Sequence, residues 1–110
     1  MGLGASRAVN MSGTQAQLVK ELISGDNVVI FSKTYCPYCT MAKEVFNKIN
    51  VTYSAIELDK RDDADAIQDI LGEITGARTV PRVFVKGQCI GGGTDVKKMY
   101  EAGKLEVLLQ

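Results

Sequence analysis

Two cysteines three positions apart, Cys36 and Cys39, are the residues whose type and spacing could do chemistry in this chain. Residues 28–31, just before them, form a short apolar run rich in β-branched side chains and predict a buried strand. Residues 40–49, just after them, carry apolar side chains at helical spacing and predict an amphipathic helix. We therefore expect the cysteines on a strand-to-helix turn. Pro37 then takes the first helical position, where its missing N–H would have had no partner anyway.

This position favours a thiolate at Cys36. The unpaired N–H groups and the positive dipole end of a helix N-terminus stabilise negative charge, and Lys33 adds a cation nearby. The thiolate is the form of cysteine that attacks disulfides. Cys39 would lie one helical turn inward, close enough to Cys36 for a disulfide. We therefore assign Cys36 as the exposed nucleophile and Cys39 as the more buried resolving thiol.

Two other interpretations of the pair are a structural disulfide and half of a zinc site. Zinc in structural sites usually takes four nitrogen or sulfur ligands, whereas this chain has three cysteines and no histidine. A Cys-x-x-Cys pair beside an alternation of strands and helices is instead typical of a redox motif.

The motif Cys36-Pro37-Tyr38-Cys39, with Thr79-Val80-Pro81, Gly91-Gly92 and Asp95 further on, resembles the dithiol glutaredoxins. Within that family the chain is most similar to the vertebrate glutaredoxin-2 type, from about Gln15 to the C-terminus. The resemblance implies an α/β thioredoxin fold. It also implies a glutathione-dependent thiol–disulfide oxidoreductase that reduces protein–glutathione mixed disulfides and protein disulfides, with glutathione as cosubstrate and no metal.

The same resemblance implies where glutathione binds. A cis Pro81 beside the cysteines would turn the backbone of Val80 toward an extended peptide. The glycine carboxylate of glutathione would meet Lys33 and Gln68, with Arg78 as a further candidate. Its γ-glutamyl end would meet a helix N-terminus. The expected glutathione-binding residues are Lys33, Tyr38, Gln68, Thr79, Val80, Pro81, Gly93, Thr94 and Asp95.

Without the resemblance these residues have plainer interpretations. Pro81 would be a trans residue at a strand start, and Asp95 a helix cap. Gln68 would be a solvated helix residue, and residues 91–93 an ordinary loop.

An alternative function is that of an iron–sulfur carrier or sensor. Some glutaredoxins bridge a cluster between two subunits, and the cluster-binding glutaredoxin-2 type usually has serine after the first cysteine. This chain has Pro37 there. Proline removes an N–H and stiffens the loop, which disfavours a cluster.

The bulk properties bound the remaining choices. The chain has 110 residues and zero net charge, enough for one domain and without a basic block for nucleic acid. No stretch approaches the ~18 apolar residues of a membrane span, and three cysteines are too few for a disulfide scaffold, which suggests a reducing compartment. We expect the protein to be a monomer. Its expected partners are glutathione, glutathionylated proteins and disulfide-containing proteins. We expect a cytoplasmic location, with mitochondrial or nuclear location as alternatives.

The elements that must position the cysteines follow in chain order. Residues 1–13 predict a disordered tail before a domain at 14–110. Met1-Gly2 with Ser6 matches an N-myristoylation pattern, and a plain flexible leader is the alternative.

Within the domain, the hydrophobic patterns predict helices at 14–24, 66–74, 96–102 and 105–109. They predict a second strand at 51–58, parallel to the first, and a hairpin of 82–85 with 88–90 around Lys86-Gly87. The result is a mixed four-stranded sheet flanked by helices.

Two residues in these elements carry expectations of their own. Thr94-Asp95 is a predicted N-cap pair for the helix at 96–102. Cys89 is expected as a buried or half-buried strand thiol, with a regulatory disulfide or glutathionylation as the alternative.

Overall fold

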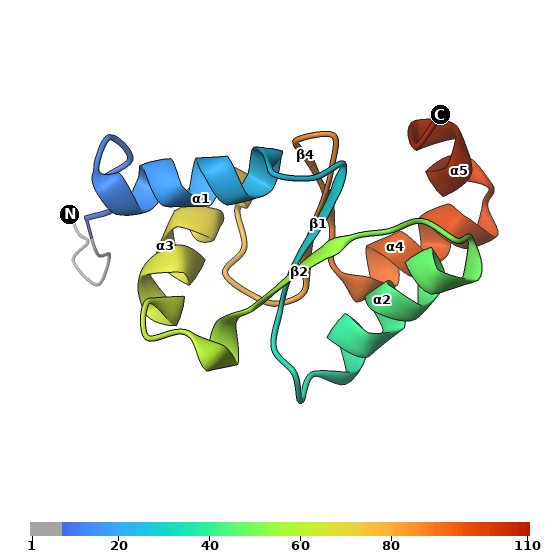
Figure 1. Ribbon diagram of the computed structural model, residues 1–110, viewed down its shortest axis with the longest axis horizontal. Helices are drawn as coiled ribbons and strands as arrows, with labels where there is room; N and C mark the ends of the chain where they lie inside the picture. Colours follow the sequence, from blue (N-terminus) through green and yellow to red (C-terminus); the bar gives the residue numbers. More distant parts are fainter. Residues whose placement is uncertain (1–7) are drawn as a thin grey trace.

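Helices and strands alternate around one central sheet in this computed structural model, which describes residues 8–110 (Figure 1). In chain order the elements are α1 (Thr14–Ser24), β1 (Val28–Ser32), α2 (Pro37–Lys48), β2 (Ser54–Glu57), the 3₁₀ turn η1 (Leu58–Lys60), α3 (Ala64–Thr75), β3 (Arg82–Val85), β4 (Gln88–Gly91), α4 (Gly93–Glu101) and α5 (Lys104–Leu108). The strand order is β2-β1-β3-β4. β1 pairs in parallel with β2 and antiparallel with β3, and β3 pairs antiparallel with β4. The predicted mixed four-stranded α/β sheet is confirmed.

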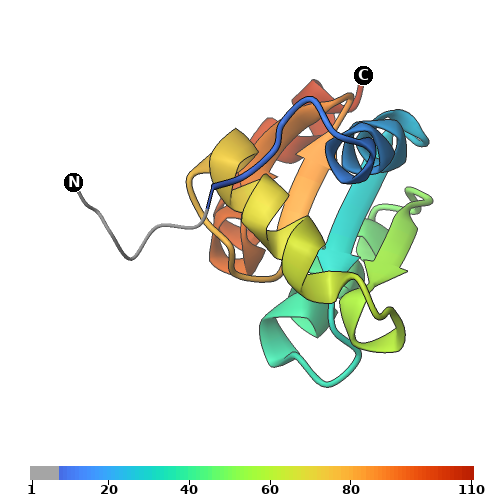
Figure 2. The same cartoon turned by 90° about the vertical axis from the view of Figure 1, so that its left-hand side faces the viewer.

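The sheet is covered on both faces. Figures 1 and 2 show α1 and α3 on one face and α2 and α4 on the other. β1 is buried along its whole length, which is why it reads as a continuous apolar run rather than an alternating one. Its side chains alternate between the two faces. Val29 and Phe31 join the core beneath α1 and α3, and Val28 and Ile30 join the core beneath α2 and α4. The central strand is therefore a fixed base for the turn that follows it.

The hairpin is built as predicted. Lys86 and Gly87, between β3 and β4, both have left-handed backbone, with φ of 51° and 83°. Two successive positive φ angles match the two-residue turn whose twist suits paired strands. The hairpin places the start of β3 at the same end of the sheet as the end of β1, since Phe31 pairs with Arg82.

Two elements have starts that differ by three residues from the predicted ones. The second strand covers only Ser54–Glu57 of the expected 51–58, because Leu58 already belongs to η1. The fourth long helix starts at Gly93 rather than Val96. Its N-cap is Gly92, so Thr94-Asp95 is not an N-cap pair but lies within the first turn.

The expectation of a buried or half-buried Cys89 is also wrong, because this thiol is exposed. Cys89 pairs with Phe84 across the β3–β4 ladder, so the two side chains share a face of the sheet. Phe84 is buried in the core beneath α1 and α3, whereas β4 is the edge strand. A residue at the edge lies beyond the cover that those helices give.

The predictions for the N-terminus fall partly outside the described residues. The N-myristoylation pattern lies entirely within residues 1–7, and so outside them. The boundary between tail and domain at residue 14 stays a prediction, although Val9 and Met11 pack against the core beneath α1 and α3. Between residues 8 and 110, none of the helices is both long and apolar enough to cross a membrane.

Candidate active site

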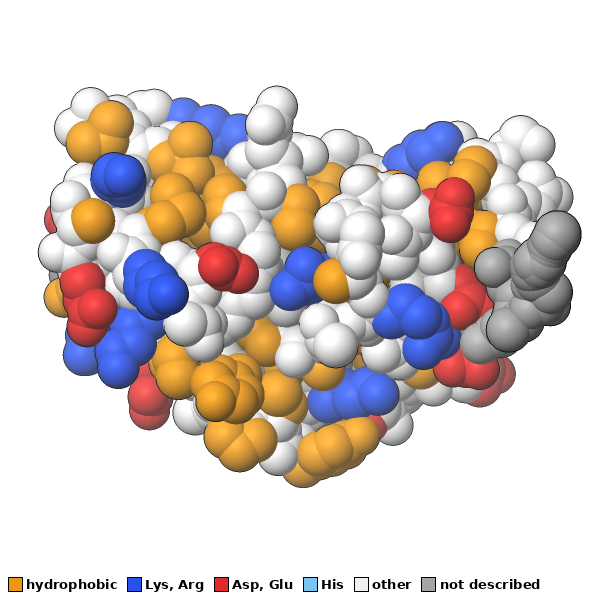
Figure 3. Space-filling view, turned by 180° about the vertical axis from the view of Figure 1, so that it is seen from behind, with side chains coloured by type: hydrophobic (Ala, Val, Ile, Leu, Met, Phe, Trp, Pro, Cys, Tyr) orange, Lys and Arg blue, Asp and Glu red, His pale blue; other side chains and the backbone are white. Residues whose placement is uncertain are grey.

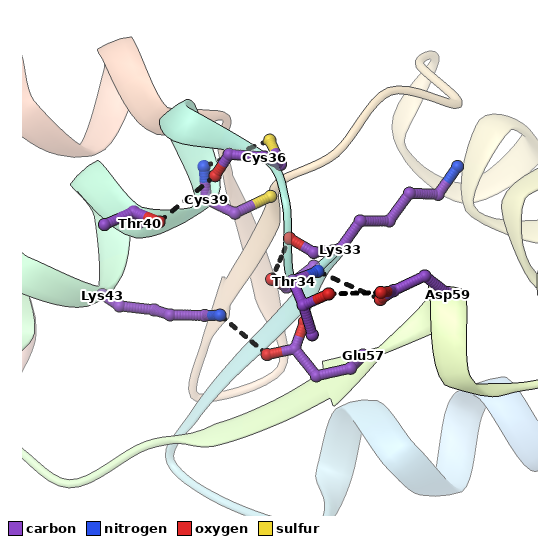
Figure 4. Close-up of polar contacts among 9 residues, drawn as sticks. Lys33, Thr34, Cys36, Cys39, Thr40, Lys43, Glu57 and Asp59 are labelled. Carbon is purple, nitrogen blue, oxygen red and sulfur yellow. Dashed lines mark hydrogen bonds and ion pairs between the residues drawn. The ribbon is translucent and has the colours of Figure 1, made fainter.

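Cys36 lies at the junction of β1 and α2, as the sequence predicts. It is the N-cap of α2, with extended backbone at φ −92° and ψ 115°, and Pro37 takes the first helical position. The backbone N–H of Cys39 donates to Cys36 Sγ at 3.3 Å. Both cysteines are free thiols, and they lie side by side at the start of the helix (Figure 4). The sulfur of Cys36 thus replaces the oxygen that a serine or aspartate would offer at this capping position.

The two thiols differ in exposure and in charge. Cys36 is half-buried, whereas Cys39 is fully buried. Burial, and then the hydrogen bond with Cys36, raises the pKa of Cys39 from 9.0 to about 11. Cys39 is therefore a neutral thiol at physiological pH, which agrees with a resolving role rather than a first attack.

A carboxylate from a distant part of the chain holds the loop before Cys36. The Thr34 backbone N–H donates to Asp59 Oδ1 at 3.0 Å, and the Thr34 hydroxyl donates to Asp59 Oδ2 (Figure 4). These bonds lower the pKa of Asp59 below its ordinary 3.8. The sequence pattern does not reveal this contact. The two residues are 25 positions apart, and only the parallel pairing of β1 with β2 brings their loops together.

An ion pair lies near the same loop. Lys43 Nζ of α2 lies 2.7 Å from Glu57 Oε2 at the end of β2. The other oxygen, Glu57 Oε1, is buried and has no hydrogen-bond partner among residues 8–110. The pair ties the first turns of α2 to the end of the parallel strand, and so helps to fix the turn that carries the cysteines.

A groove of about 190 Å³ opens beside the cysteine turn. Cys36 Sγ lies 3.9 Å from the carbonyl oxygen of Val80. The Val80–Pro81 peptide bond is cis, as the resemblance implied. The groove is lined by Tyr38, Thr79, Val80, Pro81, Arg82, Gly92, Gly93, Thr94 and Asp95. All the predicted glutathione-binding residues are in this lining except Lys33 and Gln68.

The N-terminus of α4 packs directly on the first turn of α2. A Cβ at Gly93 would lie 2.7 Å from the carbonyl oxygen of Tyr38. Because this distance is too short for a real contact, glycine is the residue that fits here without a shift of the backbone. Asp95 Oδ2 accepts the N–H of Gly92 at 2.8 Å, which satisfies the donor just before the helix. The N–H groups of the first turn of a helix have no partner within it, and here Gly93 and Thr94 line the groove. This end of the groove can therefore bind an anion.

Lys33 and Gln68 lie outside the lining of the groove. Gln68 Nε2 donates to the carbonyl oxygen of Arg78 at 2.9 Å. The Arg78 guanidinium forms ion pairs with Asp65 and Asp69 at 3.1 and 2.9 Å, so its charge is already engaged. The roles predicted for Lys33 and Gln68 in binding a carboxylate stay predictions.

Part of the surface around the cysteine turn is apolar. Tyr35 and Tyr38 flank Cys36 in sequence and are 72% and 56% exposed. In the space-filling view, hydrophobic side chains gather along the lower edge, the end at which the β1–α2 turn lies in Figure 1 (Figure 3). In the part of the chain that the structure describes, no group of three or more histidine, cysteine or carboxylate side chains could hold a metal ion.

Comparisons with known proteins agree with this geometry. A family profile described as "Glutaredoxin" matches residues 28–90. Glutaredoxin-C4 of Arabidopsis thaliana is 49% identical over 98 residues, which are 89% of this chain and 73% of that protein. Mitochondrial glutaredoxin-2 of Homo sapiens is 46% identical over 101 residues, which are 92% of this chain and 62% of the human protein. A crystal structure of a buckwheat glutaredoxin–glutathione complex superposes with a TM-score of 0.83 at 43% identity, covering 86% of each chain.

Proposed function

Because this chain belongs to the glutaredoxin family of thiol–disulfide oxidoreductases, we propose that Cys36 is the nucleophile of its disulfide exchange. The chain has the thioredoxin fold of that family and uses glutathione as cosubstrate. One observation carries the assignment of Cys36. Its sulfur is the N-cap of α2 and accepts the N–H of Cys39 at 3.3 Å. A helix N-terminus and a direct N–H donor both stabilise a thiolate.

The first half of the reaction removes glutathione from a protein. The Cys36 thiolate attacks the glutathione sulfur of the mixed disulfide and forms a Cys36–glutathione disulfide. The disulfide bond between the protein sulfur and the glutathione sulfur breaks, and the protein thiolate leaves and takes up a proton. A second glutathione thiolate then attacks the bound glutathione sulfur. This step releases oxidised glutathione and restores the Cys36 thiolate.

Protein disulfides need the second cysteine. After Cys36 attacks such a disulfide, Cys39 loses its proton, attacks Cys36 Sγ and releases the reduced protein. A Cys36–Cys39 disulfide remains. Because the pKa of Cys39 is raised to about 11, only a small fraction of this thiol is ionised at neutral pH.

The groove supplies the specificity for glutathione in this proposal. Val80 presents its backbone to the cysteinyl part of the peptide, and Tyr38, Thr79 and Pro81 form the walls beside it. Gly93, Thr94 and Asp95 receive the γ-glutamyl end at the N-terminus of α4. Lys33 and Gln68 receive the glycine carboxylate from the other end. The support for this arrangement is that one groove beside Cys36 is lined by both sets of residues. These are Tyr38, Thr79, Val80 and Pro81 for the cysteinyl part and Gly93, Thr94 and Asp95 for the γ-glutamyl end.

The partners in the proposal are glutathionylated and disulfide-containing proteins. A monomeric state and a cytoplasmic location stay predictions, and the human relative carries a mitochondrial name. No contact among residues 8–110 favours the alternative of an iron–sulfur carrier, and we do not propose that function.

The test is a glutathione-coupled reductase assay with a protein–glutathione mixed disulfide. Wild type and Cys89→Ser are expected to be equally active, because Cys89 lies on the edge strand β4, outside the residues that line the groove. Cys36→Ser is expected to be inactive. A mixed disulfide of cysteinyl-glycine, which lacks the γ-glutamyl residue, should react more slowly than the glutathione one. Equal rates with the two would contradict the groove, and an active Cys36→Ser would contradict the nucleophile.

A further inference from the structure

Arg82 lies in the wall of the groove and was not among the expected site residues. It is the first residue of β3, directly after Pro81, and its side chain is half-buried. Arg82 Nε donates to the carbonyl oxygen of Pro81 at 3.1 Å. This bond folds the guanidinium back along the groove instead of releasing it into solvent.

No carboxylate in the described part of the chain forms an ion pair with Arg82. Among residues 8–110, the arginines that form ion pairs with carboxylates are Arg61 and Arg78. A guanidinium has five N–H donors in a rigid fork that matches a carboxylate. The one hydrogen bond that the described residues accept from Arg82 is that of its Nε. A cation with free donors therefore faces a groove where an anion is expected.

A charge of opposite sign lies across Gly92. Asp95 Oδ2 accepts the Gly92 N–H at 2.8 Å. A Cβ placed on Gly92 would lie 3.0 Å from Arg82 Nη2 and 3.9 Å from Asp95 Oδ2. Arg82 and Asp95 therefore flank one glycine that has no side chain to separate them, and they do not form an ion pair with each other within 4.0 Å. A positive and a negative group held apart in this way complement a zwitterion.

The γ-glutamyl end of glutathione is such a zwitterion, with an ammonium and a carboxylate on the same carbon. We propose that Arg82 is a specificity-determining residue that binds this α-carboxylate, while Asp95 binds the α-ammonium. The inference rests on the proposed function, because it assumes that glutathione lies in this groove. The N–H groups at the start of α4 bind the same carboxylate from the other side, and Gly92 leaves room for the guanidinium to reach it.

The test uses mixed disulfides of three peptides with the same small thiol. The first peptide is glutathione. The second, γ-aminobutyryl-cysteinyl-glycine, lacks only the α-carboxylate. The third, glutaryl-cysteinyl-glycine, lacks only the α-ammonium. Arg82→Gln should lower kcat/KM by about tenfold for glutathione and the glutaryl peptide, as expected on losing a charged hydrogen bond. It should leave the γ-aminobutyryl peptide unchanged.

Asp95→Asn should show the reverse pattern, losing rate with glutathione and the γ-aminobutyryl peptide only. Arg82→Lys should recover part of the rate, since it restores the charge without the fork. The matched control is Lys97→Gln, which removes one positive charge from α4 outside the groove lining. Its kcat/KM should equal that of wild type with all three peptides. Alkylation of Cys36 by iodoacetamide should be unchanged in every variant.

Two outcomes would overturn the role of Arg82. One is an equal loss for Arg82→Gln with all three peptides, which would mean that Arg82 only supports the fold. The other is no loss with any of them. If Asp95→Asn still distinguishes the peptides in either case, the groove stands and only the role of Arg82 fails. If wild type uses a cysteinyl-glycine mixed disulfide as well as the glutathione one, the proposed function of the groove fails instead.

Discussion

The N-terminus of α2 and the N-terminus of α4 lie against each other at one groove, yet they are capped in different ways. At α2 the cap is Cys36, whose sulfur accepts a helical N–H. At α4 the cap is Gly92, which has no side chain to offer, and the carboxylate of Asp95 bonds back to its N–H. Both ends share the same unpaired donors and the same dipole. The capping residue decides whether those donors stabilise a reacting atom of the protein or remain for a ligand.

Removing the sulfur at the first terminus should have the largest effect. Cys36→Ser is expected to lose all activity, since Cys36 is the one thiol in residues 8–110 that caps a helix, and the neighbouring Cys39 is buried. Cys39→Ser should keep the reduction of glutathione mixed disulfides, which needs only the nucleophile and free glutathione, and lose the reduction of protein disulfides. The measurement is the steady-state rate with each substrate class.

Cys89→Ser is the control for loss of a thiol as such, because Cys89 is exposed and should not contribute. If Cys39→Ser and Cys36→Ser were equally inactive toward glutathione mixed disulfides, the two cysteines would act as a unit. The division of roles between nucleophile and resolving thiol would then be wrong.

Forcing the two termini apart should have the next largest effect. Gly93→Ala would place a Cβ 2.7 Å from the Tyr38 carbonyl oxygen, and overpacking of this kind typically costs about 1–3 kcal/mol. We expect the free energy of unfolding, measured in urea, to fall by that amount. We also expect KM for the glutathione mixed disulfide to rise more than kcat falls, because the displaced terminus is the one assigned to the ligand.

Gly72→Ala is the matched control. A Cβ there would lie 3.0 Å from Cγ of Arg78, a flexible side chain that can move, and alanine is favoured over glycine inside a helix. Its stability should stay the same or increase. Equal destabilisation by both substitutions would mean that the contact between the helix termini is not special.

The buried thiol of the first terminus should also make stability depend on pH. The pKa of Cys39 is raised from 9.0 to about 11, first by burial. Between these values the folded protein keeps the proton that the unfolded chain releases, so stability falls as pH rises through the window. The contribution is complete below pH 9 and lost above pH 11, and amounts to at most about 2.7 kcal/mol. Urea unfolding of the reduced protein from pH 8 upward measures it.

Cys39→Ala supplies the reference for this titration, because lysines and tyrosines change charge in the same range. The difference in unfolding free energy between wild type and Cys39→Ala should shrink as pH rises. A difference that stays constant would show that Cys39 ionises alike in the folded and unfolded chains.

The contrast between the two termini was only half visible in the sequence. The apolar run before Cys36, Pro37 after it and the helical pattern beyond all act within a few residues, so they predict the α2 terminus and its cap correctly. At α4 the sequence offers three successive glycines followed by two good capping residues. Local preference selects Thr94-Asp95 as the cap. The structure selects Gly92, because packing against Tyr38 fixes where the helix begins.

Contacts that depend on strand pairing could not be predicted locally. The anchoring of Thr34 by Asp59 and the position of Arg82 beside Gly92 both follow from the strand order β2-β1-β3-β4. Hydrophobic periodicity does not specify that order. The exposure of Cys89 depends on it too, since only the order makes β4 an edge strand. The sequence therefore predicts the elements and the reacting residues. Predicting the residues that position them requires the strand order of the sheet.

The restraint on each terminus suggests the last and smallest effect. Asp95 restrains the α4 terminus from within its own first turn, whereas Asp59 of η1, just after β2, restrains the loop before α2 through Thr34. Because Asp59 is exposed, its hydrogen bonds compete with water and contribute little. Asp59→Ala should lower kcat/KM for the glutathione mixed disulfide by about two- to fivefold. Thr34→Val, which removes only the hydroxyl, should lower it by less.

Asp62→Ala, which removes an exposed carboxylate in the same segment, is the control for net charge and should have no effect. If the restraint is the hydrogen bond itself, Thr34→Val should have no further effect once Asp59 is alanine. Additive losses would instead mean that Asp59 and Thr34 act independently, and the hydrogen bond between them would then not be the restraint.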